Sequence, residues 1–155
     1  MTRSARKSEA RRWFLQARHD LRAARWNTDG EFFDTACFLC QQSADKALKS
    51  LLYSLGKRRT ALLTHSIVEM VRLVGKQVPP IGVLEAAALE LDLHYVPSRY
   101  PNGLPSGYPH VFYGRETAER AVRHAEQIVG AVAAHYSEQG DETLFREDEG
   151  GAAQE

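Results

Sequence analysis

Apolar residues recur every three or four positions along most of the chain, which is the period of an amphipathic helix. No stretch alternates apolar and polar residues cleanly enough to predict a strand. The spacing predicts long helices over residues 8–25, 32–55 and 116–136, with shorter helices around residues 67–74 and 84–91. We therefore expect an all-α fold, an antiparallel up-and-down helical bundle of about four to five helices.

Polar and helix-breaking residues predict where several of these helices begin and end. Thr28 is followed three residues later by Glu31, the spacing of a capping box, and so predicts the start of the second long helix. Gly56 predicts its end, and Thr64 is placed to cap the next helix. The Pro79–Pro80 pair suits the first turn of a further helix, because proline has no N–H to lose there.

Residues 94–114 interrupt the helical period. This stretch holds most of the prolines and tyrosines of the chain, namely Pro97, Pro101, Pro105, Pro109, Tyr95, Tyr100, Tyr108 and Tyr113. We expect a long Pro/Tyr-rich loop before the last helix. A loop of this length in a compact domain is more often functional than a simple connection.

The length of 155 residues suits a single domain. Its 20 basic and 20 acidic side chains give no net charge. Its two ends differ, since basic residues dominate 1–25 and acidic residues dominate 137–155. We expect the bundle to occupy residues 1–136 and residues 137–155 to form an acidic, disordered tail. The basic end is either a solvated helix face or a surface that attracts phosphates.

Several kinds of chemistry are missing from the sequence. Cys37 and Cys40 are the only cysteines, so a disulfide framework is excluded and the reducing cytoplasm is favoured. Both lie on an apolar helix and are expected to be buried. Six histidines show no metal-ligand spacing and no glycine-rich phosphate loop occurs, so we expect neither a metal nor a cofactor. The apolar runs are far shorter than the roughly 20 residues that span a bilayer, so no membrane partner is expected.

The Pro/Tyr-rich stretch holds the candidate functional residues. Arg99 suits bidentate phosphate binding, a neutral histidine can accept a proton, and tyrosine rings offer faces for bases to stack on. The candidate nucleotide- or RNA-binding residues are Arg99, Tyr100, His94, Tyr95, Tyr108 and Tyr113, and the candidate catalytic residues are Arg99 and His110. The alternative is that the prolines and tyrosines only hold this segment against the bundle.

Four stretches, in order, resemble one family. The string from Ala36 to Leu52, ACFLCQQSADKALKSLL, is similar to the "QQAAEKALKALL" helix of HEPN domains. Thr64–Ile67, Leu91–Tyr100 with the following Pro101, and the alanine-rich last helix fall in the family's order, so the resemblance covers about residues 9–135. It implies a helical homodimer with a cleft between protomers for nucleotide or RNA, often encoded beside a minimal nucleotidyltransferase in a toxin–antitoxin pair.

The resemblance also implies a catalytic pattern from which this chain departs. Active HEPN ribonucleases carry an Arg followed after four to six residues by a His near the last helix, and cleave RNA without metal. Here Arg99 lies in the matching segment, but His110 follows after ten intervening residues. Arg59 and His65 have the right spacing outside the matching segment, and we attribute that match to chance.

Three functions therefore stay open. The first is a homodimer that binds nucleotide or RNA and acts with a nucleotidyltransferase, and the second is a metal-independent ribonuclease toxin that uses Arg99 and His110. The third is a ligand-free dimerisation scaffold. In some systems of the family the nucleotidyltransferase attaches AMP to a HEPN tyrosine, which makes Tyr100, Tyr108 and Tyr113 candidates by position.

Overall fold

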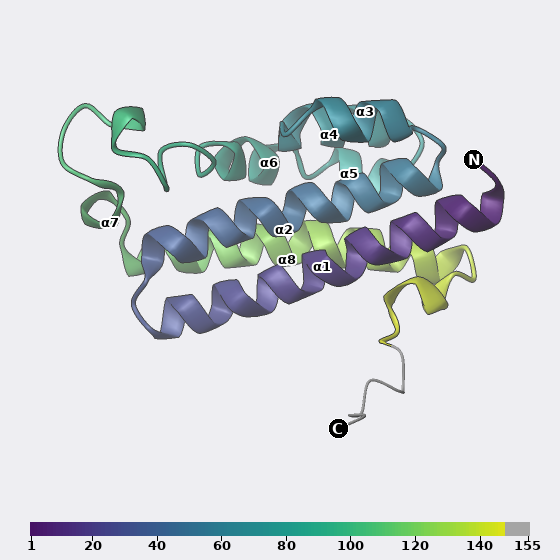
Figure 1. Ribbon diagram of the computed structural model, residues 1–155, viewed down its shortest axis with the longest axis horizontal. Helices are drawn as coiled ribbons and strands as arrows, with labels where there is room; N and C mark the ends of the chain where they lie inside the picture. Colours follow the sequence, from purple (N-terminus) through teal and green to yellow (C-terminus); the bar gives the residue numbers. More distant parts are fainter. Residues whose placement is uncertain (148–155) are drawn as a thin grey trace, which may run out of the picture.

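The computed structural model describes residues 1–147 and is built around three long helices. These are α1 (Arg3–Asp29), α2 (Phe33–Ser54) and α8 (Arg115–Glu138). They lie side by side, and α1 runs opposite to both α2 and α8 (Figure 1). The all-α fold and the helical bundle predicted from the apolar spacing are confirmed.

The remaining helices are short and return along α2 on one flank of the long helices (Figure 1). They are α3 (Arg58–Leu63), α4 (Ile67–Val74), α5 (Pro79–Gly82), α6 (Glu85–Asp92), η1 (Pro101–Gly103) and α7 (Pro109–Phe112). The last two fall in the stretch expected as a loop, which ends beside the turn between α1 and α2. Sequence periodicity does not reveal helices of one turn, because they are too short to show a period.

The core forms where the apolar stripes of the long helices meet. The α1 stripe of Ala10, Phe14, Ala17, Leu21 and Ala24 is buried against α2, which is buried over most of its circumference. Buried serines of α2 bring the two helices close, since the hydroxyls of Ser43 and Ser50 donate to main-chain carbonyls of α1 at 2.6 Å. These bonds satisfy hydroxyls that would otherwise be costly to bury.

Two predicted helix caps are wrong, although both helices begin within a residue of where the apolar spacing places them. Thr28 does not begin α2: it lies in the last turn of α1, where its hydroxyl donates to the Ala24 carbonyl, and α2 begins after Phe32 with no side-chain cap. Thr64 does not cap α4 either. Ser66 caps that helix by accepting from the Glu69 N–H. A local spacing rule cannot distinguish a capping threonine from one that bonds back into the preceding turn.

A distant residue also completes the α4 start. The Asp92 carboxylate, from the end of α6, accepts from the N–H groups of Ile67 at 2.7 Å and Val68 at 3.0 Å. A carboxylate at a helix N-terminus satisfies free N–H groups and is favoured by the helix dipole. The contact ties α6 to α4, so the segment that follows Asp92 leaves the bundle from a fixed point.

The chain after α8 differs from the tail expected for residues 137–155. α8 continues to Glu138, and η2 (Glu142–Phe145) folds back on α1 with Leu144 buried and the Phe145 ring 5.9 Å from that of Phe14. The packed part of the chain therefore includes these residues. The part of the expected tail over residues 148–155 lies outside the described residues.

Candidate functional site

Arg99 lies on the exposed side of α2, close to where that helix begins. Its guanidinium donates to the Thr35 hydroxyl at 3.2 Å, and its Cζ lies 5.4 Å from the centre of the Phe38 ring. No acidic side chain among residues 1–147 forms an ion pair with it. A hydroxyl and a ring orient the guanidinium without neutralising its charge.

His110 reaches the same turn of α2. Its Nδ1 lies 3.1 Å from Oδ1 of Asp34, the residue directly before Thr35. The fold therefore brings Arg99 and His110 to adjacent residues of one helix, although they are far apart in sequence. Both side chains are exposed. A carboxylate behind one imidazole nitrogen orients the ring and leaves the other nitrogen to a ligand.

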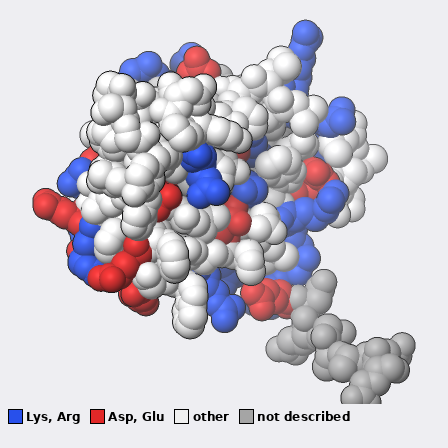
Figure 2. Space-filling view, turned by 60° about the vertical axis from the view of Figure 1, so that its left-hand side comes forward, with Lys and Arg blue, Asp and Glu red and all other residues white. Residues whose placement is uncertain are grey.

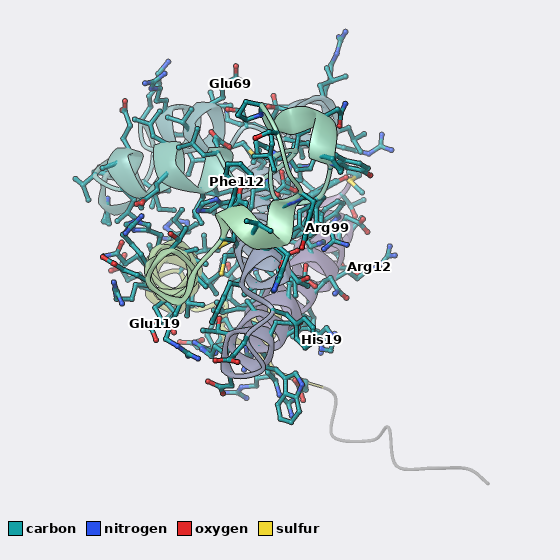
Figure 3. The ribbon with its side chains drawn as sticks, turned by 90° about the vertical axis from the view of Figure 1, so that its left-hand side faces the viewer. Arg12, His19, Glu69, Arg99, Phe112 and Glu119 are labelled. Carbon is teal, nitrogen blue, oxygen red and sulfur yellow. The ribbon has the colours of Figure 1, made fainter. Side chains whose placement is uncertain are left out.

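A row of planar groups continues from Arg99 along α2. The rings of Phe38 and Tyr95 are nearly parallel, with centres 6.4 Å apart, and Tyr95 in turn stacks on His65 at 5.6 Å. We call Arg99, Phe38, Tyr95 and His65 the α2 row. Seen along the bundle, Arg99 lies on the same side as Arg12 of α1, and Glu119 of α8 lies on the other side (Figure 3).

A buried ion pair supports the far end of the α2 row. Nζ of Lys49 lies 2.9 Å from Oδ2 of Asp45 and 3.0 Å from Nδ1 of His65. Asp45 and Lys49 are buried, whereas the His65 side chain is 57% exposed. Burial raises the pKa of the Asp45 carboxyl, although the hydrogen bond and charge of Lys49 lower it. The second carboxylate oxygen, Oδ1, makes no hydrogen bond within the described residues.

Two of the predicted binding residues face the bundle. His94 is buried, and its ring meets Tyr113 edge-on at 5.4 Å. Burial lowers the pKa of His94 to about 4, so its imidazole is neutral at pH 7. Burial likewise raises the pKa of the half-buried Tyr113 to about 12. These two residues hold the segment that carries Tyr95 and Arg99, and they are not part of the exposed row.

The other two predicted tyrosines, Tyr100 and Tyr108, are exposed. They belong to an apolar surface on the segment between α6 and α8, which we call the loop surface. Its exposed members are Leu93, Tyr95, Val96, Tyr100, Tyr108, Val111 and Phe112. A broad uncharged area appears on this side of the molecule in Figure 2. Exposed apolar surface of this kind is typical of a protein contact.

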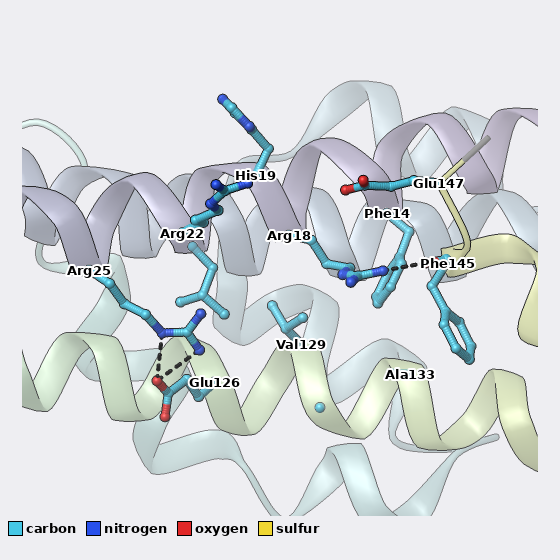
Figure 4. A pocket seen from close by; sticks show the side chains of 12 residues that line it. Phe14, Arg18, His19, Arg22, Arg25, Glu126, Val129, Ala133, Phe145 and Glu147 are labelled. Carbon is cyan, nitrogen blue, oxygen red and sulfur yellow. Dashed lines mark hydrogen bonds and ion pairs between the residues drawn. The ribbon is translucent and has the colours of Figure 1, made fainter. Parts of the chain in front are cut away.

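A second cationic surface lies between α1 and α8. This α1–α8 groove has a volume of about 590 Å³ and a rim formed by Arg18, His19, Arg22 and Arg25 (Figure 4). Two of its three arginines contact groups of the chain itself: Arg25 pairs with Glu126 at 2.9 Å, and Arg18 donates to the Phe145 carbonyl. Glu147 also lines the groove.

Burial and arrangement decide whether the cysteines and the possible metal ligands of the described part of the chain form further sites. Cys37 and Cys40 are buried and unpaired, as predicted, and burial raises the pKa of both thiols, that of Cys37 to about 12. No group of three or more His, Cys, Asp or Glu residues in 1–147 is arranged to hold a metal ion. No helix over the same residues has the length and apolar character needed to cross a membrane.

Comparison with known proteins assigns the class. The HEPN domain model matches residues 10–136, and the chain therefore belongs to the HEPN domain family. Among solved structures, TT1696 from Thermus thermophilus is 36% identical with a TM-score of 0.75, and the match covers 81% of this chain and 97% of that one. No curated protein matches the chain significantly.

Two further solved structures carry the family name. ST0689, described as an archaeal HEPN homologue, is 32% identical with a TM-score of 0.68, covering 82% of this chain and 97% of its own. A HEPN domain protein from Thermotoga maritima, tm0613, is 29% identical with a TM-score of 0.63, covering 81% and 98%. The fold and family predicted by resemblance are confirmed.

Sequence reasoning did not find the Asp45–Lys49–His65 cluster. One signal was available, because Asp45 and Lys49 are charged residues four positions apart on the most apolar helix of the chain. Such a pair either faces solvent or is buried with partners, and the spacing does not distinguish these cases. His65 is in contact with the cluster through the fold, from a turn distant in sequence.

Proposed function

We propose that this HEPN protein is a homodimer that binds a nucleotide or RNA in a cleft between protomers, with Arg99 as the phosphate contact. The observation that carries the proposal is the charge of Arg99, which is held in place by Thr35 and Phe38 and is not paired with an acid among residues 1–147. Exposed Tyr100 directly follows it in the chain and suits base stacking. The other members of the loop surface, Leu93, Val96, Val111 and Phe112, supply apolar area for a second protomer.

We further propose that the dimer acts with a minimal nucleotidyltransferase in a toxin–antitoxin-type pair in the cytoplasm. The exposed tyrosines of the loop surface suit modification by such an enzyme better than Tyr113, which is half-buried and has a raised pKa. Co-expression with a minimal nucleotidyltransferase should add the mass of AMP at Tyr100 or Tyr108. Intact-mass spectrometry measures this, and an unchanged mass contradicts it.

The binding test compares two arginines. Light scattering should give the mass of a dimer, and calorimetric titration with ATP should show saturable binding. Arg99→Ala should weaken it by about tenfold, because a hydrogen bond to a charged group contributes roughly 1.5–3 kcal/mol. Arg123→Ala is the matched control, since Arg123 is exposed on α8, four residues after Glu119. A monomer, or equal affinity for wild type and Arg99→Ala, contradicts the proposal.

A second candidate function is metal-independent RNA cleavage. The contacts of His110 with Asp34 and of Arg99 with Thr35 favour it, because they gather both groups on one helical turn. His110 would take the proton of a 2′-hydroxyl, whose oxygen attacks the phosphorus to form a 2′,3′-cyclic phosphate. The bond to the 5′-oxygen breaks, that oxygen takes a proton from water, and Arg99 would stabilise the charge on the phosphate. Cleavage of RNA in EDTA that His110→Asn abolishes supports it, and intact RNA contradicts it.

The third candidate is a dimerisation scaffold without ligand. The loop surface is compatible with it, since apolar area alone explains association. The same titrations decide between scaffold and binding protein. A scaffold forms a dimer but shows no saturable heat with ATP or RNA.

A further inference from the structure

The α2 row is longer than a single nucleotide. Arg99 contacts Thr35 at one end, and His65 lies against Asp45 at the other. Ten residues of helix separate these two positions, which corresponds to about 15 Å at about 1.5 Å per residue. A stacked strand advances about 3.4 Å per nucleotide, so the row matches about four nucleotides.

The His65 end is prepared for an anion. The ammonium of Lys49 is directed at Nδ1 of His65, which leaves Nε2 as the nitrogen available to a ligand. With Lys49 donating, the neutral ring carries its hydrogen on Nε2 and presents a donor. Oδ1 of Asp45 lies 3.6 Å from the same Nδ1 and lacks a hydrogen bond among the described residues.

The middle of the α2 row is aromatic. Phe38 and Tyr95 lie nearly parallel, with 9° between their planes, His65 stacks on Tyr95 in turn, and Tyr95 is 36% exposed. Base stacking on aromatic rings contributes about 1–3 kcal/mol per base and tolerates any sequence. Aromatic rings placed between two cationic or donor groups are the arrangement used by proteins that bind single strands.

We infer that the α2 row binds a short single strand of RNA, with Arg99 and His65 on different phosphates and the exposed part of Tyr95 in contact with a base between them. This rests on the proposed function and narrows its ligand to an oligonucleotide. A mononucleotide reaches only the Arg99 end. Removing His65 therefore weakens the binding of a strand and leaves the binding of a mononucleotide unchanged.

The test measures the affinity of the full-length protein for two probes, ATP by calorimetry and fluorescein-labelled hexa-adenylate RNA by anisotropy. His65→Ala should weaken hexa-adenylate binding by about tenfold and ATP binding by less than about twofold. Tyr95→Leu keeps apolar packing and should also weaken only the RNA. Arg99→Ala should weaken both ligands.

His19→Ala is the matched control, because His19 is also exposed but lies in the α1–α8 groove. Thermal melting checks that each variant is folded. If ATP binds through Arg99 but His65→Ala leaves hexa-adenylate binding unchanged, RNA binding along the α2 row is wrong, while the proposed nucleotide site at Arg99 stands. If the wild-type protein binds neither probe, both proposals fail.

Discussion

The α2 row and the α1–α8 groove are both cationic, but they differ in what their charged groups already contact. In the groove, Arg25 pairs with Glu126 and Arg18 donates to a main-chain carbonyl of the C-terminal segment. In the row, Arg99 contacts only a hydroxyl and a ring among the described residues. The groove has more arginines, but Glu126 neutralises Arg25 there, whereas Arg99 is oriented by Thr35 and Phe38 and has no acidic partner among residues 1–147. The contacts of an arginine, more than the number of arginines nearby, indicate whether it is available to a phosphate.

The two surfaces also differ in how deeply the ion pair next to each of them is buried. A buried ion pair, Asp45–Lys49, lies behind His65, whereas the Arg25–Glu126 pair of the groove is exposed to solvent on both sides. Exposed pairs contribute little to stability because water and salt screen them. Removing one member of a buried pair leaves the other charge buried alone, which is far more costly.

The largest expected effect tests this difference between a buried and an exposed ion pair. Lys49→Met should lower the free energy of unfolding at pH 7 by about 3 kcal/mol, because Asp45 is left buried without its cation. Glu126→Gln should change it by less than about 1 kcal/mol. Urea unfolding measures both.

The loss in Lys49→Met should also depend on pH. Burial already raises the pKa of Asp45, and removal of Lys49 raises it further. The penalty is present above that pKa and is relieved as the pH falls through it, since the carboxyl becomes neutral. The double variant Asp45→Leu/Lys49→Met should recover most of the stability, and a double variant as unstable as Lys49→Met contradicts a buried pair.

The next effect concerns the segment that carries the row. Burial lowers the pKa of His94 from 6.5 to about 4, so the unfolded chain takes up a proton before the folded protein does. The stability that neutral His94 contributes is present above about pH 6.5 and is lost as the pH falls toward about 4. At pH 5 the expected loss is about 2 kcal/mol relative to pH 7.

Urea unfolding of wild type and His94→Gln at both pH values isolates this contribution. The difference between pH 7 and pH 5 should shrink by about 2 kcal/mol in His94→Gln. The full wild-type difference between pH 7 and pH 5 should be retained in His19→Gln, which alters an exposed histidine of the groove. An equal pH dependence in wild type and His94→Gln would contradict this account, since it would mean that His94 has the same pKa in the folded and the unfolded protein.

The smallest effects concern RNA affinity and its salt dependence. Arg22→Ala, in the groove, should change the affinity for hexa-adenylate by less than about twofold. Arg99→Ala should lower the slope of log affinity against log salt by about 0.7, the value for one phosphate contact with a single strand. Equal slopes for Arg99→Ala and wild type, together with a reduced slope for Arg22→Ala, would reverse the roles of the two surfaces.

The long helices could be predicted from the sequence because their apolar stripes are long enough to show the helical period. The stripe of Phe14, Ala17, Leu21 and Ala24 is buried as expected. The short helices α3 and α7 and the caps of α2 and α4 could not be predicted in this way, whereas the Pro79–Pro80 pair did predict the first turn of α5. One of those caps depends on Asp92, a contact between residues distant in the sequence.

The candidate site was predicted in part. Arg99, Tyr95 and His110 were selected by residue type, and the structure gives each a contact on α2 or beside it. His94 was selected for the same reason, but it is buried. Residue type alone does not reveal the direction of a side chain, and an irregular segment has no period from which to infer it.

The central claim is that RNA lies along α2 and contacts Arg99, Tyr95 and His65. Photo-crosslinking of hexanucleotide RNA containing 4-thiouridine, followed by mass spectrometry of the peptides, tests it most directly. The account predicts crosslinks at Phe38, Tyr95 or His65, and their loss in Arg99→Ala under conditions where the wild type is half saturated. Crosslinks confined to α1 and α8 residues of the groove, or unchanged by Arg99→Ala, would contradict it.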